Sequence, residues 1–177
     1  GGDGCMMEGI SYDAFSLAGT LKLGKLIVLY DSNKISIEGD TDIAFQEDVK
    51  KRFESFGFQT LVVENGNDLE EIGKAIAEAK ADTTRPTMIT VRTKIGHGCP
   101  AKEGTASAHG EPLGVENVRA LKENLGMDPD KEFYIPQEVY DNAAKIVAEN
   151  EKEEQKWNAL FAEYCEKFPE MKELWDK

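Results

Sequence analysis

KLIVLY, residues 25–30, is a nearly continuous apolar run of strand length. A strand this apolar is typical of a parallel sheet that helices cover on both faces. Two further runs of strand length follow at residues 59–63 and 86–91, and the latter begins with Pro86, where a missing N–H is tolerated. Segments with helical spacing lie around these runs. The sequence therefore predicts an α/β fold with a parallel sheet flanked by helices.

Helical spacing of apolar residues occurs in four segments around the strands. They cover residues 9–23, 49–56, 69–79 and 115–125. Asn67 or Asp68 is available as the N-cap of the third of these helices. Pro136 can open a further helical region, which we expect to end near Pro169. That region contains an apolar stripe of Trp157, Leu160, Phe161, Tyr164 and Phe168.

Composition narrows the class of protein. With 177 residues, 40% hydrophobic and 31% charged, the chain has the make-up of an ordinary globular domain. Its formal charge of −13 argues against nucleic acid and against an anionic membrane surface as partners. Three scattered cysteines without a CxxC spacing argue against structural zinc and favour reduced thiols. We expect a cytoplasmic protein, or an organellar one if a targeting segment is missing from the sequence.

The segment 94–114 differs from the rest of the chain. It contains five glycines, two prolines and both histidines, His97 and His109. Long loops in compact domains are often functional. We therefore expect residues 1–114 to form the ligand-binding part of a domain and residues 115–177 to form a helical C-terminal extension of it.

A candidate ligand site lies where two strands should end. Gly2-Asp3-Gly4 opens the chain, and Asn33 and Ile35 follow the KLIVLY strand. In parallel sheets, ligands bind beyond the carboxyl ends of the strands. A carboxylate, an amide oxygen and a backbone carbonyl at this edge would suit Mg²⁺ or Ca²⁺ beside a diphosphate. From the spacing alone, a Gly-Asp-Gly turn with an unrelated asparagine is an equally good interpretation.

The order of longer motifs resembles transketolase over essentially the whole chain. The matching segments are GDGCMMEGIS (2–11), SLAG (16–19), LIVLYDSNKISIE (26–38), DV (48–49), VENGN (63–67), KIGHG (94–98), HGEPL (109–113), WN (157–158) and KFPE (167–170). The GDG…N pattern marks thiamine diphosphate enzymes in general. The MEGIS, DSNKISIEG and HGEPL segments are more specific to transketolases.

This resemblance implies roles for individual residues. Asp3, Asn33 and the Ile35 carbonyl match the ligands that hold Mg²⁺ or Ca²⁺ against the diphosphate of the cofactor, thiamine diphosphate. Gly2 and Gly4 match the glycines of that motif, and the Gly4 backbone is implied to contact the diphosphate. The implied fold is the thiamine diphosphate-binding fold, present in part.

The resemblance also implies roles for residues further along the chain. Glu8, which we group with the cofactor-binding residues, matches an acidic residue in a carboxylate network between two active sites. His109 matches a loop histidine that reaches the diphosphate and the substrate, and an imidazole there suits proton transfer near neutral pH. Three positions depart from the family pattern. Asp13 replaces a glutamate, His97 an aromatic residue and Ala106 a histidine.

The implied activity is transfer of a two-carbon ketol unit between phosphorylated sugars, with thiamine diphosphate as electron sink. The implied partners are sugar phosphates, the remaining transketolase domains and a second, identical subunit. Because the resemblance covers only half of the diphosphate-binding domain, we expect the chain to be inactive alone.

Three other interpretations stay open at this point. A dihydroxyacetone synthase would share these motifs, and a substrate profile would separate it. A thiamine-dependent decarboxylase or oxoacid dehydrogenase should lack HGEPL and the WN…KFPE tail. A non-catalytic fragment that acts as a binding or regulatory partner is the third.

Overall fold

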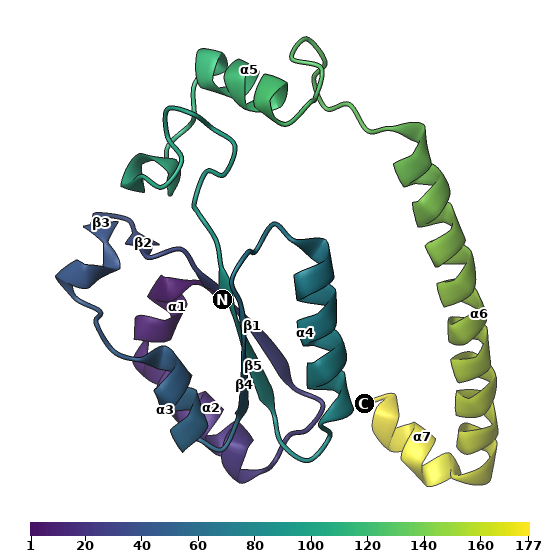
Figure 1. The fold of residues 1–177 in the computed structure, drawn as a ribbon. Coiled ribbons are helices and arrows are strands. Elements are labelled where there is room, and N and C mark those ends of the chain that lie inside the picture. Colours follow the sequence, from purple (N-terminus) through teal and green to yellow (C-terminus); the bar gives the residue numbers. More distant parts are fainter. The chain divides into compact units, whose positions relative to one another are not determined.

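The computed structural model describes residues 1–177 and divides them into two compact units, Gly1–Asp130 and Lys131–Lys177. The first unit contains a parallel sheet with its helices, and the second consists of two helices (Figure 1). No helix combines the length and the apolar character that crossing a bilayer requires. The predicted α/β fold is confirmed.

Three parallel strands form the sheet of the first unit. They are β1 (Ile27–Ser32), β4 (Gln59–Val63) and β5 (Thr87–Arg92), in the order β1-β5-β4. Each overlaps a predicted strand, with ends that differ by no more than two residues. Gly2 forms an isolated parallel bridge with Asp31, so the start of the chain lies along the free edge of β1.

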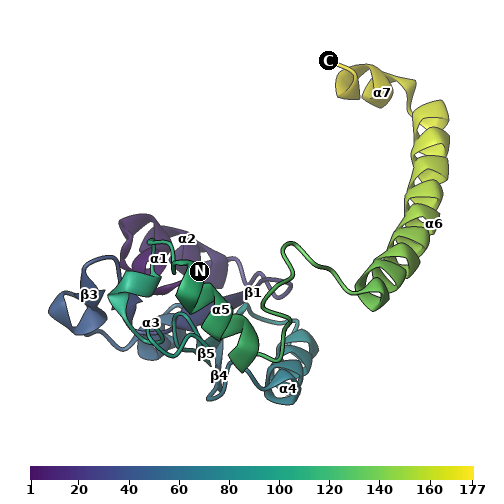
Figure 2. The same cartoon turned by 90° about the horizontal axis from the view of Figure 1, so that it is seen from above.

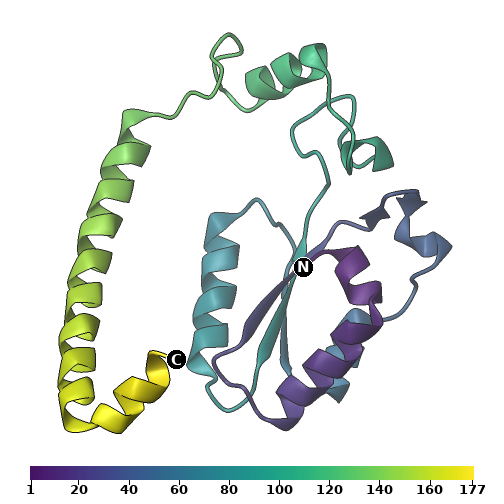
Figure 3. The same ribbon diagram turned by 180° about the vertical axis from the view of Figure 1, so that it is seen from behind.

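Helices cover both faces of this sheet (Figures 2 and 3). α1 (Asp3–Met7), α2 (Gly9–Thr20) and α3 (Val49–Ser55) lie on one face, and α4 (Leu69–Ala81) lies on the other. Alternate strand residues supply the two cores because successive side chains point to opposite faces. The α2/α3 core contains Met6, Ala18, Tyr30, Val49, Phe53, Phe58 and Met88. The α4 core contains Val63, Ala75, Ala79, Ile89 and Val91.

Most of the apolar residues whose spacing predicted α2 do not pack into the core. On α2, Phe15 and Ala18 pack against the first core, whereas Ile10, Leu17 and Leu21 are more than half exposed. The side of the helix that its apolar residues define is therefore mostly exposed in the first unit. A Cβ at Gly19 would lie 1.8 Å from the Phe56 carbonyl oxygen, so glycine permits the close contact of α2 with the end of α3.

Helix ends follow the local sequence. Asp68, one of the two expected caps of α4, accepts hydrogen bonds from the N–H groups of Glu70 and Glu71 at 2.9 and 3.2 Å. α2 ends at Thr20, three residues before the predicted end. An additional helix, α1, begins at Asp3, where the sequence predicted the end of a strand.

A short hairpin between β1 and α3 was not predicted. It consists of β2 (Ile35–Ser36) and β3 (Gly39–Asp40), followed by a 3-10 turn at Thr41–Ile43. Strands of two residues carry no periodic signal in a sequence. The Thr41 N–H donates to the Lys34 carbonyl at 2.9 Å, which ties the hairpin to the loop that follows β1.

The predicted loop 94–114 leads to α5 (Val115–Asn124) and contains one 3-10 turn, Ala106–Ala108. Its first part is held by the Glu103 carboxylate, which accepts a hydrogen bond from the Gly98 N–H at 2.8 Å. The Asn124 side chain donates to the Gly98 carbonyl at 2.9 Å and so joins the end of α5 to the loop.

The second unit consists of a long helix, α6 (Gln137–Lys167), and a short helix, α7 (Pro169–Trp175), that packs against its end. α6 ends before Pro169, which opens α7. The Phe161 ring stacks on Trp157 with centroids 5.0 Å apart and contacts Trp175 at 5.2 Å. The Tyr164 and Phe168 rings also contact each other, with centroids 5.0 Å apart, while Trp157 and Leu160 of the predicted apolar stripe stay more than half exposed.

Candidate cation and diphosphate site

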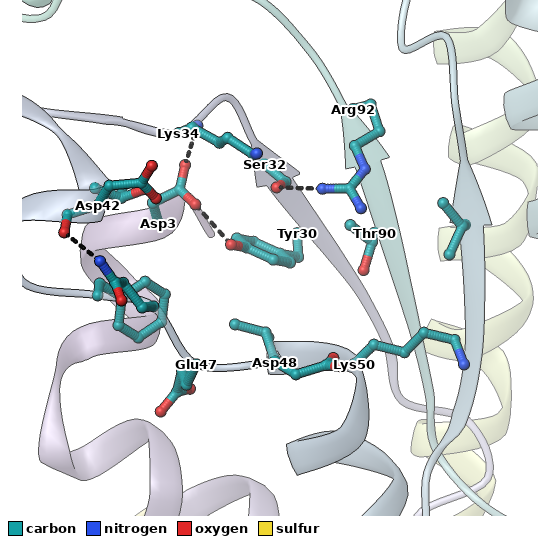
Figure 4. Close-up of a pocket in the computed structure, with 15 residues that line it drawn as sticks. Asp3, Tyr30, Ser32, Lys34, Asp42, Glu47, Asp48, Lys50, Thr90 and Arg92 are labelled. Carbon is teal, nitrogen blue, oxygen red and sulfur yellow. Dashed lines mark hydrogen bonds between the residues drawn. The ribbon is translucent and has the colours of Figure 1, made fainter.

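Asp3 is the central residue of the candidate site. It is the first residue of α1, and the residue is 4% exposed. Its Oδ1 accepts a hydrogen bond from the Tyr30 hydroxyl at 2.6 Å (Figure 4). Its Oδ2 accepts from the N–H groups of Asn33 and Lys34 at 3.1 and 3.0 Å. Three donors thus fix a buried carboxylate at the carboxyl end of β1.

The loop after β1 folds around this carboxylate. Lys34 has a φ of 62°, in the left-handed region, and the N–H groups of Asn33 and Lys34 both point toward Asp3. The Asn33 side-chain oxygen accepts from the Ile35 N–H at 2.9 Å. A hydrogen bond therefore joins Asp3 to Asn33, two of the three residues predicted to hold the cation. The third, Ile35, is hydrogen-bonded to Asn33.

The donor set fits a hard cation. A carboxylate offers about four lone-pair sites, and three hydrogen bonds leave room for one more partner. An amide oxygen and a backbone carbonyl add neutral oxygen donors of the kind that Mg²⁺ and Ca²⁺ accept. No group of three or more His, Cys, Asp or Glu side chains in the chain is arranged so that it could hold a metal ion. A cation here would thus depend on one carboxylate, neutral oxygens and a ligand's phosphate.

Tyr30 is a buried proton donor in this site. Burial raises the pKa of its hydroxyl well above the usual value, and the hydrogen bond to Asp3 raises that pKa further. The hydroxyl therefore stays protonated and donates to the carboxylate throughout the physiological pH range. The sequence predicts Tyr30 only as the last residue of an apolar strand, because nothing local marks a core tyrosine as a partner of Asp3.

A polar pocket of about 340 Å³ lies next to Asp3, against the α2/α3 face of the sheet. Tyr30, Ser32, Thr90 and Arg92 line it from the carboxyl ends of β1 and β5 (Figure 4). Arg92 Nη1 donates to Ser32 Oγ at 3.3 Å. Sequence reasoning missed these residues. The sequence feature that could have identified them is their alternation, because every second residue near the ends of two neighbouring strands lies on the same face of the sheet.

The predicted glycines lie beside open space. Gly2 and Asn33 help to line a second pocket of about 470 Å³, with Asp31 and Thr93. Gly4 lies in the first turn of α1, and a Cβ built there would meet no atom within 4 Å. The protein itself therefore leaves the backbone at Gly4 accessible to a ligand.

Two predicted residues lie apart from the Asp3 hydrogen-bond network. Glu8 is exposed at the break between α1 and α2, and His109 is exposed at the end of the Ala106–Ala108 turn. No hydrogen bond joins either side chain to Asp3 or Asn33. Their roles stay predictions.

Comparison with known proteins identifies the family. The model of the transketolase thiamine diphosphate-binding domain matches residues 1–177. "Transketolase 1" of Saccharomyces cerevisiae is 53% identical over 172 residues, covering 96% of this chain and 25% of that protein. A transketolase of Bacillus subtilis is 51% identical over 173 residues, covering 97% of this chain and 26% of that protein.

Solved structures agree. The transketolase of Pichia stipitis in complex with sedoheptulose 7-phosphate superimposes with a TM-score of 0.87 at 46% identity, over 96% of this chain and 25% of that one. The transketolase of Leishmania mexicana gives a TM-score of 0.87 at 43% identity, over 95% and 25%. The chain thus spans about a quarter of the length of these relatives. The family model covers the whole chain, and the chain therefore belongs to the transketolase family through its thiamine diphosphate-binding domain.

Proposed function

We propose that this chain supplies the cation- and diphosphate-binding part of a transketolase site that takes thiamine diphosphate with Mg²⁺ or Ca²⁺. The observation that carries the proposal is the buried Asp3 carboxylate, which three hydrogen bonds hold next to Asn33 and Ile35. These three residues would hold the cation. Gly2 and Gly4 would let the diphosphate approach the backbone.

The proposed reaction is transfer of a two-carbon ketol unit between phosphorylated sugars. Thiamine diphosphate supplies the electron sink when bound. Asp3 and Asn33 would orient the cation and diphosphate, and His109 would transfer a proton near the reacting carbon. The Pichia stipitis relatives solved with sedoheptulose 7-phosphate and with xylulose 5-phosphate support sugar phosphates as the substrate class.

Catalysis at the proposed site, as distinct from binding, needs partners because the chain spans only about a quarter of its relatives' length. These would be further transketolase domains and a second subunit, with Glu8 near the interface. The isolated 177 residues are expected to have no transketolase activity. A cytoplasmic location remains part of the proposal.

Calorimetry tests the site directly. Thiamine diphosphate with Mg²⁺ is titrated into the unchanged chain, into Asp3→Ala and into a control, Asp42→Ala. Asp42 is an exposed carboxylate that lines the pocket beside Asp3 without bonding to it. We expect binding by the unchanged chain and the control and loss of binding in Asp3→Ala. Equal binding by all three would remove Asp3 from the proposed site.

A further inference from the structure

Tyr30 is a core aromatic residue whose hydroxyl has a charged partner. Its ring belongs to the α2/α3 core, and the residue is 4% exposed. A phenylalanine would fill the same apolar volume. The hydroxyl instead reaches the Asp3 carboxylate at 2.6 Å, from the end of β1 to the start of α1 (Figure 4).

The three hydrogen bonds on Asp3 come from two directions. The loop N–H groups of Asn33 and Lys34 both donate to Oδ2, whereas Tyr30 donates to Oδ1. With donors on one oxygen only, the carboxylate could turn about its Cβ–Cγ bond. The Tyr30 hydroxyl fixes the plane of the carboxylate and therefore the direction of its one remaining lone-pair site.

We propose that Tyr30 is a positioning residue for the divalent cation, because its hydroxyl holds the Asp3 carboxylate in the orientation that binds the metal. The inference rests on the proposed function, since it takes Asp3 as the cation ligand. Groups that hydrogen-bond to metal ligands fix the orientation of those ligands, and their loss typically weakens metal binding 10–100-fold.

Tyr30→Phe removes the hydroxyl and keeps the ring in the core. The matched control is Thr90→Val. Thr90 lies opposite Tyr30 in β5, is buried, lines the same pocket and donates its hydroxyl to Met88 Sδ at 3.3 Å rather than to Asp3. Both variants therefore remove one buried hydroxyl from the same pocket.

Two measurements are made on the 177-residue chain. Electron paramagnetic resonance of Mn²⁺ in the presence of thiamine diphosphate gives the metal affinity. Amide hydrogen exchange without metal reports the bonds from Asn33 and Lys34 to Asp3. We expect about tenfold weaker Mn²⁺ binding in Tyr30→Phe, together with faster exchange at these two amides, and no change in Thr90→Val.

The outcomes separate the inference from the proposed function. If the unchanged chain binds no Mn²⁺, the proposed function fails, and the role of Tyr30 fails with it. If the unchanged chain and Tyr30→Phe bind Mn²⁺ equally, the inference alone fails. Equal weakening by Thr90→Val would show that any lost hydroxyl in the pocket has this effect, which also overturns the inference.

Discussion

The Asn33 N–H donates a hydrogen bond of 3.1 Å to the Asp3 carboxylate, across 30 positions of sequence. The bond forms because Gly2 pairs with Asp31 in parallel register, so that the start of α1 and the end of β1 reach the same edge of the sheet. Asp3 is buried there, and its hydrogen bonds make it important for stability as well as for ligand binding.

Replacing this carboxylate should destabilise the fold. Asp3→Asn places an NH₂ group where one oxygen accepts a hydrogen bond, so that at least one of the three donors loses its partner. A loss of about 1–3 kcal/mol in the free energy of unfolding is expected. Urea denaturation measures it, with exposed Asp42→Asn as control. If both variants are equally stable, the Asp3 hydrogen bonds contribute nothing to the fold.

Gly4 and Gly73 allow a test that separates ligand binding from stability. Both are exposed residues of helices, and a Cβ at either would meet no atom within 4 Å. Gly73→Ala, in the interior of α4, should raise the free energy of unfolding by about 0.5–1 kcal/mol. Gly4→Ala should not destabilise the fold, but should weaken thiamine diphosphate binding because its methyl group would occupy the space near the diphosphate. Equal affinities of both variants for thiamine diphosphate would contradict a role for the Gly4 backbone.

Glu47 should stabilise a buried guanidinium. Its Oε1 lies 2.6 Å from Arg52 Nη1, and the Arg52 side chain is 8% exposed and lies over the Tyr12 ring at 4.1 Å. Two further nitrogens of Arg52 are buried without a partner, so the charge depends strongly on Glu47. Glu47→Gln is expected to cost about 1–3 kcal/mol.

An exposed ion pair serves as the control for Glu47→Gln. Lys156 pairs with Glu153 on α6, and both side chains are more than two-thirds exposed. Lys156→Gln should change the free energy of unfolding by less than about 1 kcal/mol. A Glu47→Gln variant no less stable than this control would mean that burial adds nothing to the Arg52 pair.

Asp82 should show a pH-dependent contribution to stability. It follows α4 and accepts hydrogen bonds from the Thr84 hydroxyl at 2.6 Å, the Arg85 side chain at 2.8 Å and the Thr84 N–H at 3.0 Å. The Thr84 hydroxyl, and then Arg85, lower the pKa of Asp82 from 3.8 to about 2.

Because this pKa is lower in the folded state, the stabilisation is complete above 3.8 and is lost as the pH falls through about 2. Asp82→Asn should therefore be less stable than the unchanged chain near neutral pH, and the difference should vanish in strong acid. Carboxyl titration by NMR and urea denaturation at several pH values measure both effects. A titration of Asp82 near 3.8 would refute the assignment.

The strands and most helices were predictable because they are long enough to show a period. Gln59–Val63 was predicted to the residue, and α4 was predicted with Asp68 among its two possible caps. The hairpin β2–β3 was not, since strands of two residues carry no repeated pattern, and the five-residue helix α1 is too short to show the helical period. The exposure of Ile10, Leu17 and Leu21 was also unpredictable, because spacing shows that a helix is amphipathic but not what covers its apolar side.

The sequence by itself determined the fold class, the strand-end positions of Asp3 and Asn33 and the resemblance to transketolase, because these depend on residue type and order. Only the tertiary structure decided the order β1-β5-β4, the wrapping of residues 33–35 around the Asp3 carboxylate and the partnership of Asp3 with Tyr30. These features depend on contacts between residues about 30 to 60 positions apart, and contacts of that range leave no trace in local sequence. The same carboxylate is thus both a candidate cation ligand and a buried link between α1 and β1.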